Sequence, residues 1–69
     1  MKFKELDIIV AKRNINERVV KGTDGCIMMV FNSENFLVEF FVDSPLGNSD
    51  DLLTVSIDDI AFHPQSMIH

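Results

Sequence analysis

A strict alternation of apolar side chains across residues 36–42 constrains the fold more than any other feature of this sequence. The alternating positions are Phe36, Val38, Phe40 and Val42. A repeat of two residues is typical of a strand with one buried face and not of a helix. A continuous apolar run at residues 26–31 precedes it across the short polar link 32–35, which predicts a hairpin. Because residues 26–31 are apolar throughout, we expect that strand to be buried on both sides.

The rest of the chain continues this β pattern. Three further apolar runs predict strands at residues 6–11, 52–55 and 61–63. Pro, Gly, Asn and Asp between residues 44 and 51 predict a turn region before the fourth of the five strands. Ser56, followed three residues later by Asp59, resembles a capping box and predicts a single helical turn. The sequence therefore predicts an all-β, five-stranded SH3-like barrel with a helical turn before the last strand, as a single domain over residues 1–69 with its core at 5–64.

The segment 12–24 interrupts the strands. It is rich in Asn and charged residues and too polar for a core strand, so it predicts a long excursion loop. Three apolar side chains within it are expected to tuck against the barrel: Ile15, Val19 and Val20.

Length and cysteine content narrow the class of protein. A chain of 69 residues offers one domain and no deep active-site cavity. Cys26 is the only cysteine, which excludes an internal disulfide and a thiolate-only zinc site and favours a cytoplasmic location. The N-terminal residues 1–7 mix charged with apolar side chains, unlike a signal peptide, and no apolar run is long enough for a membrane span. We therefore expect no membrane association.

Charge is distributed unevenly along the chain. All six Lys and Arg lie in residues 1–21, whereas residues 22–69 hold eight Asp and Glu and no Lys or Arg. The net charge of −5 therefore conceals a positive first third and a strongly acidic remainder.

The run Lys-Gly-Thr-Asp-Gly-Cys-Ile at residues 21–27 resembles the KOW-type element of SH3-like barrels. A longer pattern is similar to a family of small uncharacterised bacterial proteins known as a domain of unknown function. Its parts are Leu6-Asp7-Ile8-Ile9, Lys21-Gly22 to Ile27, Val38-Glu39-Phe40 and Asp59-Ile60. The resemblance implies the barrel fold and carries over no catalytic residue.

Several groups of residues could in principle form catalytic or ligand-binding sites, but a structural role is the simpler interpretation of each. Gly22 and Gly25 lack the longer motif of a phosphate loop and are expected to permit positive φ at a strand entry. Asp58 and Asp59 are adjacent and therefore point apart, which favours capping over acid–base catalysis. The set Asp43, Asp50 and Asp51 lacks the spacing of a calcium loop. A metal site made of Cys26, His63 and His69 lacks a short ligand pair. We expect neither a cofactor nor enzymatic activity.

Four basic residues form the main alternative binding site. Lys12, Arg13, Arg18 and Lys21 concentrate positive charge and, with Phe3, would contact a nucleic-acid backbone. Against this, exposed aromatic platforms for bases are not expected, and the acidic remainder of the chain repels phosphate. A solvated loop is the favoured interpretation.

A surplus of apolar side chains carries more weight than any of these sites. Strands 26–31 and 36–42 have apolar residues on both faces, so Met28, Leu37 and Phe41 are candidates for an exposed patch. The alternative is that a bulge near Met28 or the loop 12–24 covers them. We expect a protein-binding module, an inhibitor or antitoxin-like regulator whose partner is a protein with a basic surface. Its predicted partner-binding residues are Met28, Leu37, Phe41, Asp43, Asp50 and Asp51. A KOW-like nucleic-acid binder and a structural homo-oligomer such as a homodimer are the alternatives.

Overall fold

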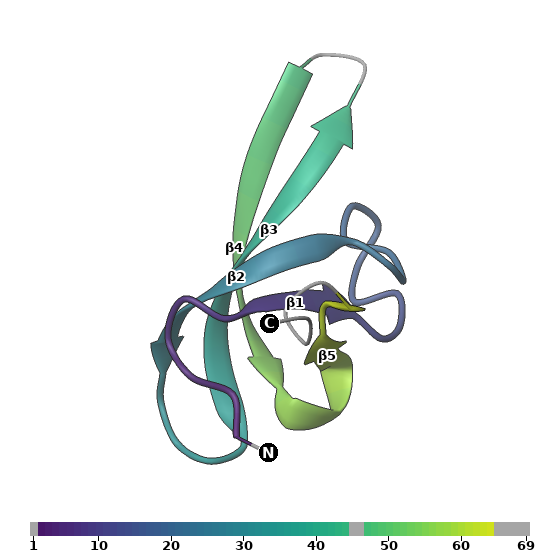
Figure 1. Ribbon diagram of the computed structural model, residues 1–69. Coiled ribbons are helices and arrows are strands. Elements are labelled where there is room, and N and C mark those ends of the chain that lie inside the picture. Colours follow the sequence, from purple (N-terminus) through teal and green to yellow (C-terminus); the bar gives the residue numbers. More distant parts are fainter. Residues whose placement is uncertain (1, 45–46, 65–69) are drawn as a thin grey trace.

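Five strands and one short 3-10 turn make up the fold in the computed structural model, which describes residues 2–44 and 47–64 but not the side chains of 43, 44 and 47–50 (Figure 1). The elements are β1 (Ile8–Ala11), β2 (Asp24–Val30), β3 (Asn35–Ser44), β4 (Gly47–Ser56), the 3-10 turn η1 (Ile57–Asp59) and β5 (Ile60–Phe62). No α-helix occurs in these two ranges. The prediction of an all-β chain with a single helical turn before the last strand is confirmed.

The strands form one antiparallel sheet in the order β4-β3-β2-β1-β5, which curls into a half-barrel of the SH3-like type. β1 lies between β2 and the edge strand β5, with Ile9 paired to Gly25 of β2 on one side and to Phe62 of β5 on the other. In Figure 1 the β3–β4 hairpin projects from the curled part of the sheet. The strands at the two edges are therefore β4 and β5.

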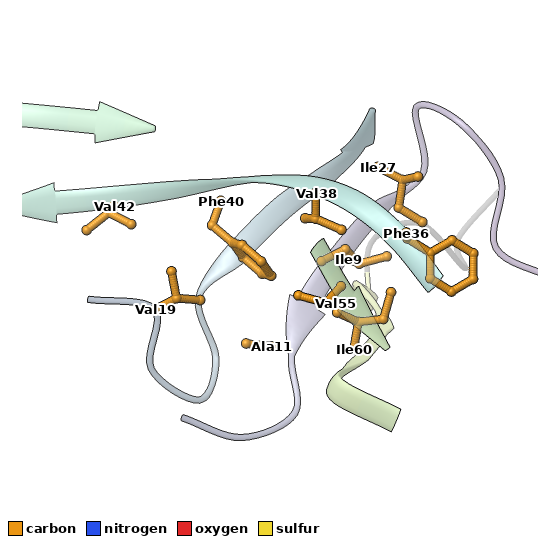
Figure 2. Close-up of a cluster of buried hydrophobic side chains, with 10 residues drawn as sticks. All are labelled: Ile9, Ala11, Val19, Ile27, Phe36, Val38, Phe40, Val42, Val55 and Ile60. Atoms are coloured by element: carbon orange, nitrogen blue, oxygen red, sulfur yellow. The ribbon is translucent and has the colours of Figure 1, made fainter. Parts of the chain in front are cut away.

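The buried face of the sheet encloses a core of ten apolar residues (Figure 2). They are Ile9, Ala11, Val19, Ile27, Phe36, Val38, Phe40, Val42, Val55 and Ile60. The four alternating positions of β3 are all among them, so the predicted face of that strand is confirmed.

The loop between β1 and β2 contributes one full core residue. Val19 is completely buried and Ile15 packs partly against the core, as expected, but Val20 is exposed. The Asn16 side chain accepts hydrogen bonds from the backbone N–H groups of Arg18 and Val19 at 2.8 and 2.7 Å. This turn directs Val19 inward, and Val20, the next residue, remains outside.

The burial of β2 differs from the prediction. Only Gly25 and Ile27 are buried in this strand, whereas Met28, Met29 and Val30 are exposed. Ile27 pairs with Val38 and Met29 pairs with Leu37, so Met28 is an extra residue in a β-bulge. The bulge near Met28, which was the alternative to an exposed patch, is present, but Met28 and Met29 remain exposed.

The turn predicted between residues 44 and 51 is wrong for most of its length. The ladder between β3 and β4 continues without a break to the pair Ser44 and Gly47, so β4 is far longer than the predicted strand 52–55. Long-range pairing with β3 has outweighed the weak local strand preference of Asn, Ser and Asp in this segment.

The two glycines at the entry to β2 serve different purposes. Gly22 has a φ of 91°, the conformation expected from the sequence. Gly25 has no positive φ and is instead buried against β3, where an added Cβ would lie 2.9 Å from Val38 Cγ1 and 3.0 Å from the Glu39 carbonyl oxygen. The prediction of a positive φ is confirmed for Gly22 and wrong for Gly25. At position 25 a residue without a side chain is required because β3 is too close for a Cβ atom.

Candidate protein-binding surface

The register of the sheet places apolar side chains side by side on its outer face, opposite the core. Residues paired across an antiparallel ladder share a face. One row runs from Ile8 through Cys26 and Glu39 to Leu52, and the next runs from Met29 through Leu37 to Thr54. With Phe41 and the bulge residue, these rows form what we call the outer-face patch: Ile8, Met28, Met29, Leu37, Phe41 and Leu52.

The outer-face patch is open to solvent. Leu52 is 57% exposed, Met29 48% and Phe41 44%, while Leu37 is half-buried between neighbouring strands. For Leu37 and Phe41 this follows from the strand repeat of two, because the residues that flank them along β3 fill the core. The structure thus brings the predicted residues Met28, Leu37 and Phe41 onto one side of the molecule and adds Ile8, Met29 and Leu52. Sequence reasoning missed Ile8 and Leu52 because the partner strands of β2 and β3 were not assigned in register.

A carboxylate lies among the apolar side chains of the outer-face patch. Glu39 lies half-buried between Cys26 and Leu52 in the ladder. Burial raises the pKa of the Cys26 thiol, and the nearby charges of Glu39 and Asp7 raise it further. The thiol therefore remains protonated at neutral pH, and it packs as a small apolar group within the patch.

The three acidic residues that were predicted to bind the partner do not belong to the outer-face patch as the structure describes it. Asp51 faces the loop, where its Oδ2 accepts a hydrogen bond from Arg18 Nε at 2.8 Å. Asp43 and Asp50 contribute their backbone to the ladder between β3 and β4, and their side chains lie outside the described part of the structure.

Two of the four predicted basic residues bind carboxylates of the same chain. Arg13 Nε donates to Asp59 Oδ1 at 2.6 Å, and Arg18 contacts Asp51 as described above. These pairs join residues 46 and 33 positions apart, so no local sequence pattern would have revealed them. Lys12 and Lys21 are exposed. The arginines therefore hold the loop against η1 and β4, which leaves less positive charge for nucleic acid than the sequence suggests.

Lys21 and Arg18 nevertheless share a polar groove with an aromatic ring. They line it together with Val20, Asp24 and the exposed face of Phe41. Phe3, the aromatic residue first considered for nucleic-acid contact, instead stacks on Phe62 with ring centroids 4.3 Å apart.

Asp59 connects the 3-10 turn to the loop. Its Oδ2 accepts the Ser56 backbone N–H at 2.9 Å, while the Asp58 N–H donates to Ser56 Oγ, so the predicted capping box is confirmed. Burial alone would raise the pKa of Asp59, but the hydrogen bonds from Ser56 and Arg13 and the charge of Arg13 outweigh it and lower the pKa below its ordinary value of 3.8. The ionised carboxylate is therefore the form that the fold stabilises.

Asp59→Asn should reduce the free energy of unfolding by about 1–2 kcal/mol at neutral pH. Because the pKa is lower in the folded state, the stabilisation by Asp59 is complete above the unfolded pKa and is lost as pH falls through the folded pKa. Urea denaturation at pH 7 and at pH 3 should show the variant losing less stability on acidification than the wild type. Asp58→Asn, at the exposed neighbouring carboxylate, is the control; an equal effect there would contradict the assignment.

The remaining candidates form no further site. His63 Nε2 lies 3.4 Å from Asp24 Oδ1, and His69 lies outside the described residues. Within residues 2–44 and 47–64, no three His, Cys, Asp or Glu side chains gather closely enough to hold a metal ion.

A cavity of about 270 Å³ opens at one end of the barrel, lined by Phe3, Val30, Phe36 and Ile57 with Lys2, Asn32 and Ser33 at its polar part. Sequence reasoning missed it because its wall comes from the N-terminal segment.

No helix in the part of the chain that the structure describes is long and apolar enough to cross a membrane. Comparison of the chain with models of protein families, with curated protein sequences and with solved structures gives no match.

Proposed function

We propose that this protein is a non-enzymatic protein-binding module that uses the outer-face patch as its contact surface. The supporting observation is the contiguity of the patch, which spans four neighbouring strands through paired positions. Scattered exposed apolar residues are ordinary on a protein surface, but a continuous group in which Met and Phe take part is typical of an interaction site.

The charge around the patch indicates the kind of partner. Residues 34–59 hold seven Asp and Glu and no Lys or Arg, and they include β3 and β4, which carry half of the patch. A partner with a basic surface would therefore be attracted to this side of the sheet and oriented on it. An inhibitor or antitoxin-like regulator, which covers a basic functional surface of its target, fits these properties.

Photo-crosslinking tests the proposal directly. A crosslinking amino acid in place of Leu37 should attach to a partner protein in an extract of the native host, whereas the same amino acid in place of Ile57, in the 3-10 turn that follows β4, should not. The partner, once identified and purified, should bind Met29→Gln and Leu52→Gln variants about tenfold or more weakly, because these side chains are large and are the most exposed of the patch.

Ile57→Gln is the matched control, since Ile57 is also an exposed apolar residue but lies by the end cavity. Affinity for the partner should be unchanged in this variant. Equal weakening by Ile57→Gln would contradict the patch as the contact surface. A crosslink only between copies of this chain, together with a dimer that persists at high salt in sedimentation equilibrium, would favour the structural homo-oligomer instead.

A further inference from the structure

β4 presents a long free edge. It has ten residues and pairs with β3 alone, while the other edge strand, β5, has three residues. In an edge strand, the backbone N–H and C=O groups of every second residue point away from the sheet and can form hydrogen bonds with another strand. Among the described backbone groups, no hydrogen bond outside the ladder with β3 is made by residues 51–55.

Of the features that usually prevent pairing at an edge, the described side chains of β4 supply only one charge, that of Asp51, which pairs with Arg18. Proteins protect exposed edges with proline, lysine, bulges or very short strands. Residues 47–56 contain neither Pro nor Lys, and the ten pairs with β3 follow one another without a register shift. Figure 1 shows that the β3–β4 hairpin projects from the curled part of the sheet, so the projecting part of β4 stands away from the other strands.

The acidic surroundings select among possible strands. Among the described carboxylates of residues 34–59, Asp51 and Asp59 are matched by Arg18 and Arg13, whereas Glu34, Glu39 and Asp58 form no ion pair with a described residue. A second copy of β4 would bring like charges together, because Asp50 and Asp51 lie in the middle of the strand. A strand that carries Lys or Arg would gain from the same charges.

We propose that the edge of β4 accepts an extended, basic segment of the partner as a sixth strand of the sheet. This inference rests on the proposed protein-binding function and specifies how the partner's backbone is bound. Main-chain hydrogen bonds would provide affinity, and alternate side chains of the segment would lie beside Leu52 and extend the outer-face patch. The remaining side chains would face the inner side of β4, toward Leu53 and Asp51.

A ten-residue peptide of alternating lysine and valine, equal in length to β4, is the probe. In amide-resolved NMR of the full chain, the peptide should slow hydrogen exchange at every second amide of residues 51–56 and leave β5 unchanged. The same peptide N-methylated at alternate residues cannot donate its hydrogen bonds and should bind about tenfold more weakly or less. A peptide of alternating glutamate and valine should not bind, and binding of the lysine peptide should weaken as salt rises.

Variants of the protein separate charge from backbone pairing. Glu39→Gln and Asp58→Asn should each weaken binding of the lysine peptide by roughly twofold to fivefold, while Glu17→Gln, an exposed carboxylate in the basic loop, should leave it unchanged. Equal binding of the N-methylated peptide, or protection at any place other than β4, would overturn the sixth strand. If the peptide results contradict the sixth strand but crosslinking from position 37 still identifies a partner, the proposed function survives. If crosslinking fails while the peptide protects β4 from exchange, only the proposed function is lost.

Discussion

A Phe40→Ala variant should melt roughly 15–30 °C below the wild type. Phe40 is completely buried at the centre of the core, and removing a buried phenylalanine ring costs about 3–5 kcal/mol, because the lost contacts leave a cavity. In a domain of this size each kcal/mol shifts the melting temperature by about 4–8 °C. The total stability of such a small domain is about 3–10 kcal/mol, so part of the variant should be unfolded at room temperature.

Phe41→Ala is a control that differs by one position. Phe41 is 44% exposed on the outer face, so its removal should change the free energy of unfolding by less than about 1 kcal/mol. Both variants require far-UV circular dichroism, since the chain contains no Trp or Tyr to report by fluorescence. A similar loss in the two variants would show that the assignment of the faces of β3 is wrong.

A Gly25→Ala variant should lose about 2–3 kcal/mol although it adds a single methyl group. The new Cβ would lie 2.9 Å from Val38 Cγ1 and 3.0 Å from both the Glu39 carbonyl oxygen and Phe40 Cδ1. One of these atoms belongs to the backbone of β3 and the others to fully buried side chains, so the clash is relieved only if the two strands move apart. Urea denaturation measures the loss.

Two further variants identify the cause of that loss. Gly22→Ala meets no atom within 4 Å and should cost only the backbone strain of its positive φ, about 1–2 kcal/mol. Combining Gly25→Ala with Phe40→Leu should cost less than the sum of the two single changes, because the smaller side chain removes one of the three contacts. If the two losses of unfolding free energy are strictly additive, contact with Phe40 is not a cause of the loss in Gly25→Ala.

The faces of β3 could be predicted from the sequence because they depend on local alternation. Phe36 to Val42 repeat every second residue, and nothing elsewhere in the chain changes which side is buried. The capping box at Ser56 was equally predictable, since all of its hydrogen bonds are made within four residues.

Features that depend on distant residues could not be predicted in the same way. The length of β4 is set by its pairing with β3, which holds weak strand formers such as Asn48 and Ser49 in an extended ladder. The outer-face patch was anticipated from the surplus of apolar residues, but its neighbours Ile8 and Leu52 depend on register. The two arginine–aspartate pairs, which reduce the case for nucleic-acid binding, join opposite ends of the chain.

The position of β1 has a consequence for the synthesis of the protein. β1 pairs with β2, which follows it soon on the ribosome, and with β5, the last strand of the sheet to be translated. The Lys12 N–H also donates to the Asp59 carbonyl oxygen at 2.8 Å. Until residues 60–62 have left the exit tunnel, one side of β1 in the nascent chain has no partner strand, and the hydrogen bond between Lys12 and Asp59 cannot hold the start of the loop. The barrel therefore closes only after β5 has emerged from the ribosome, and a chain stalled before Ile60 presents an open strand edge to chaperones and proteases.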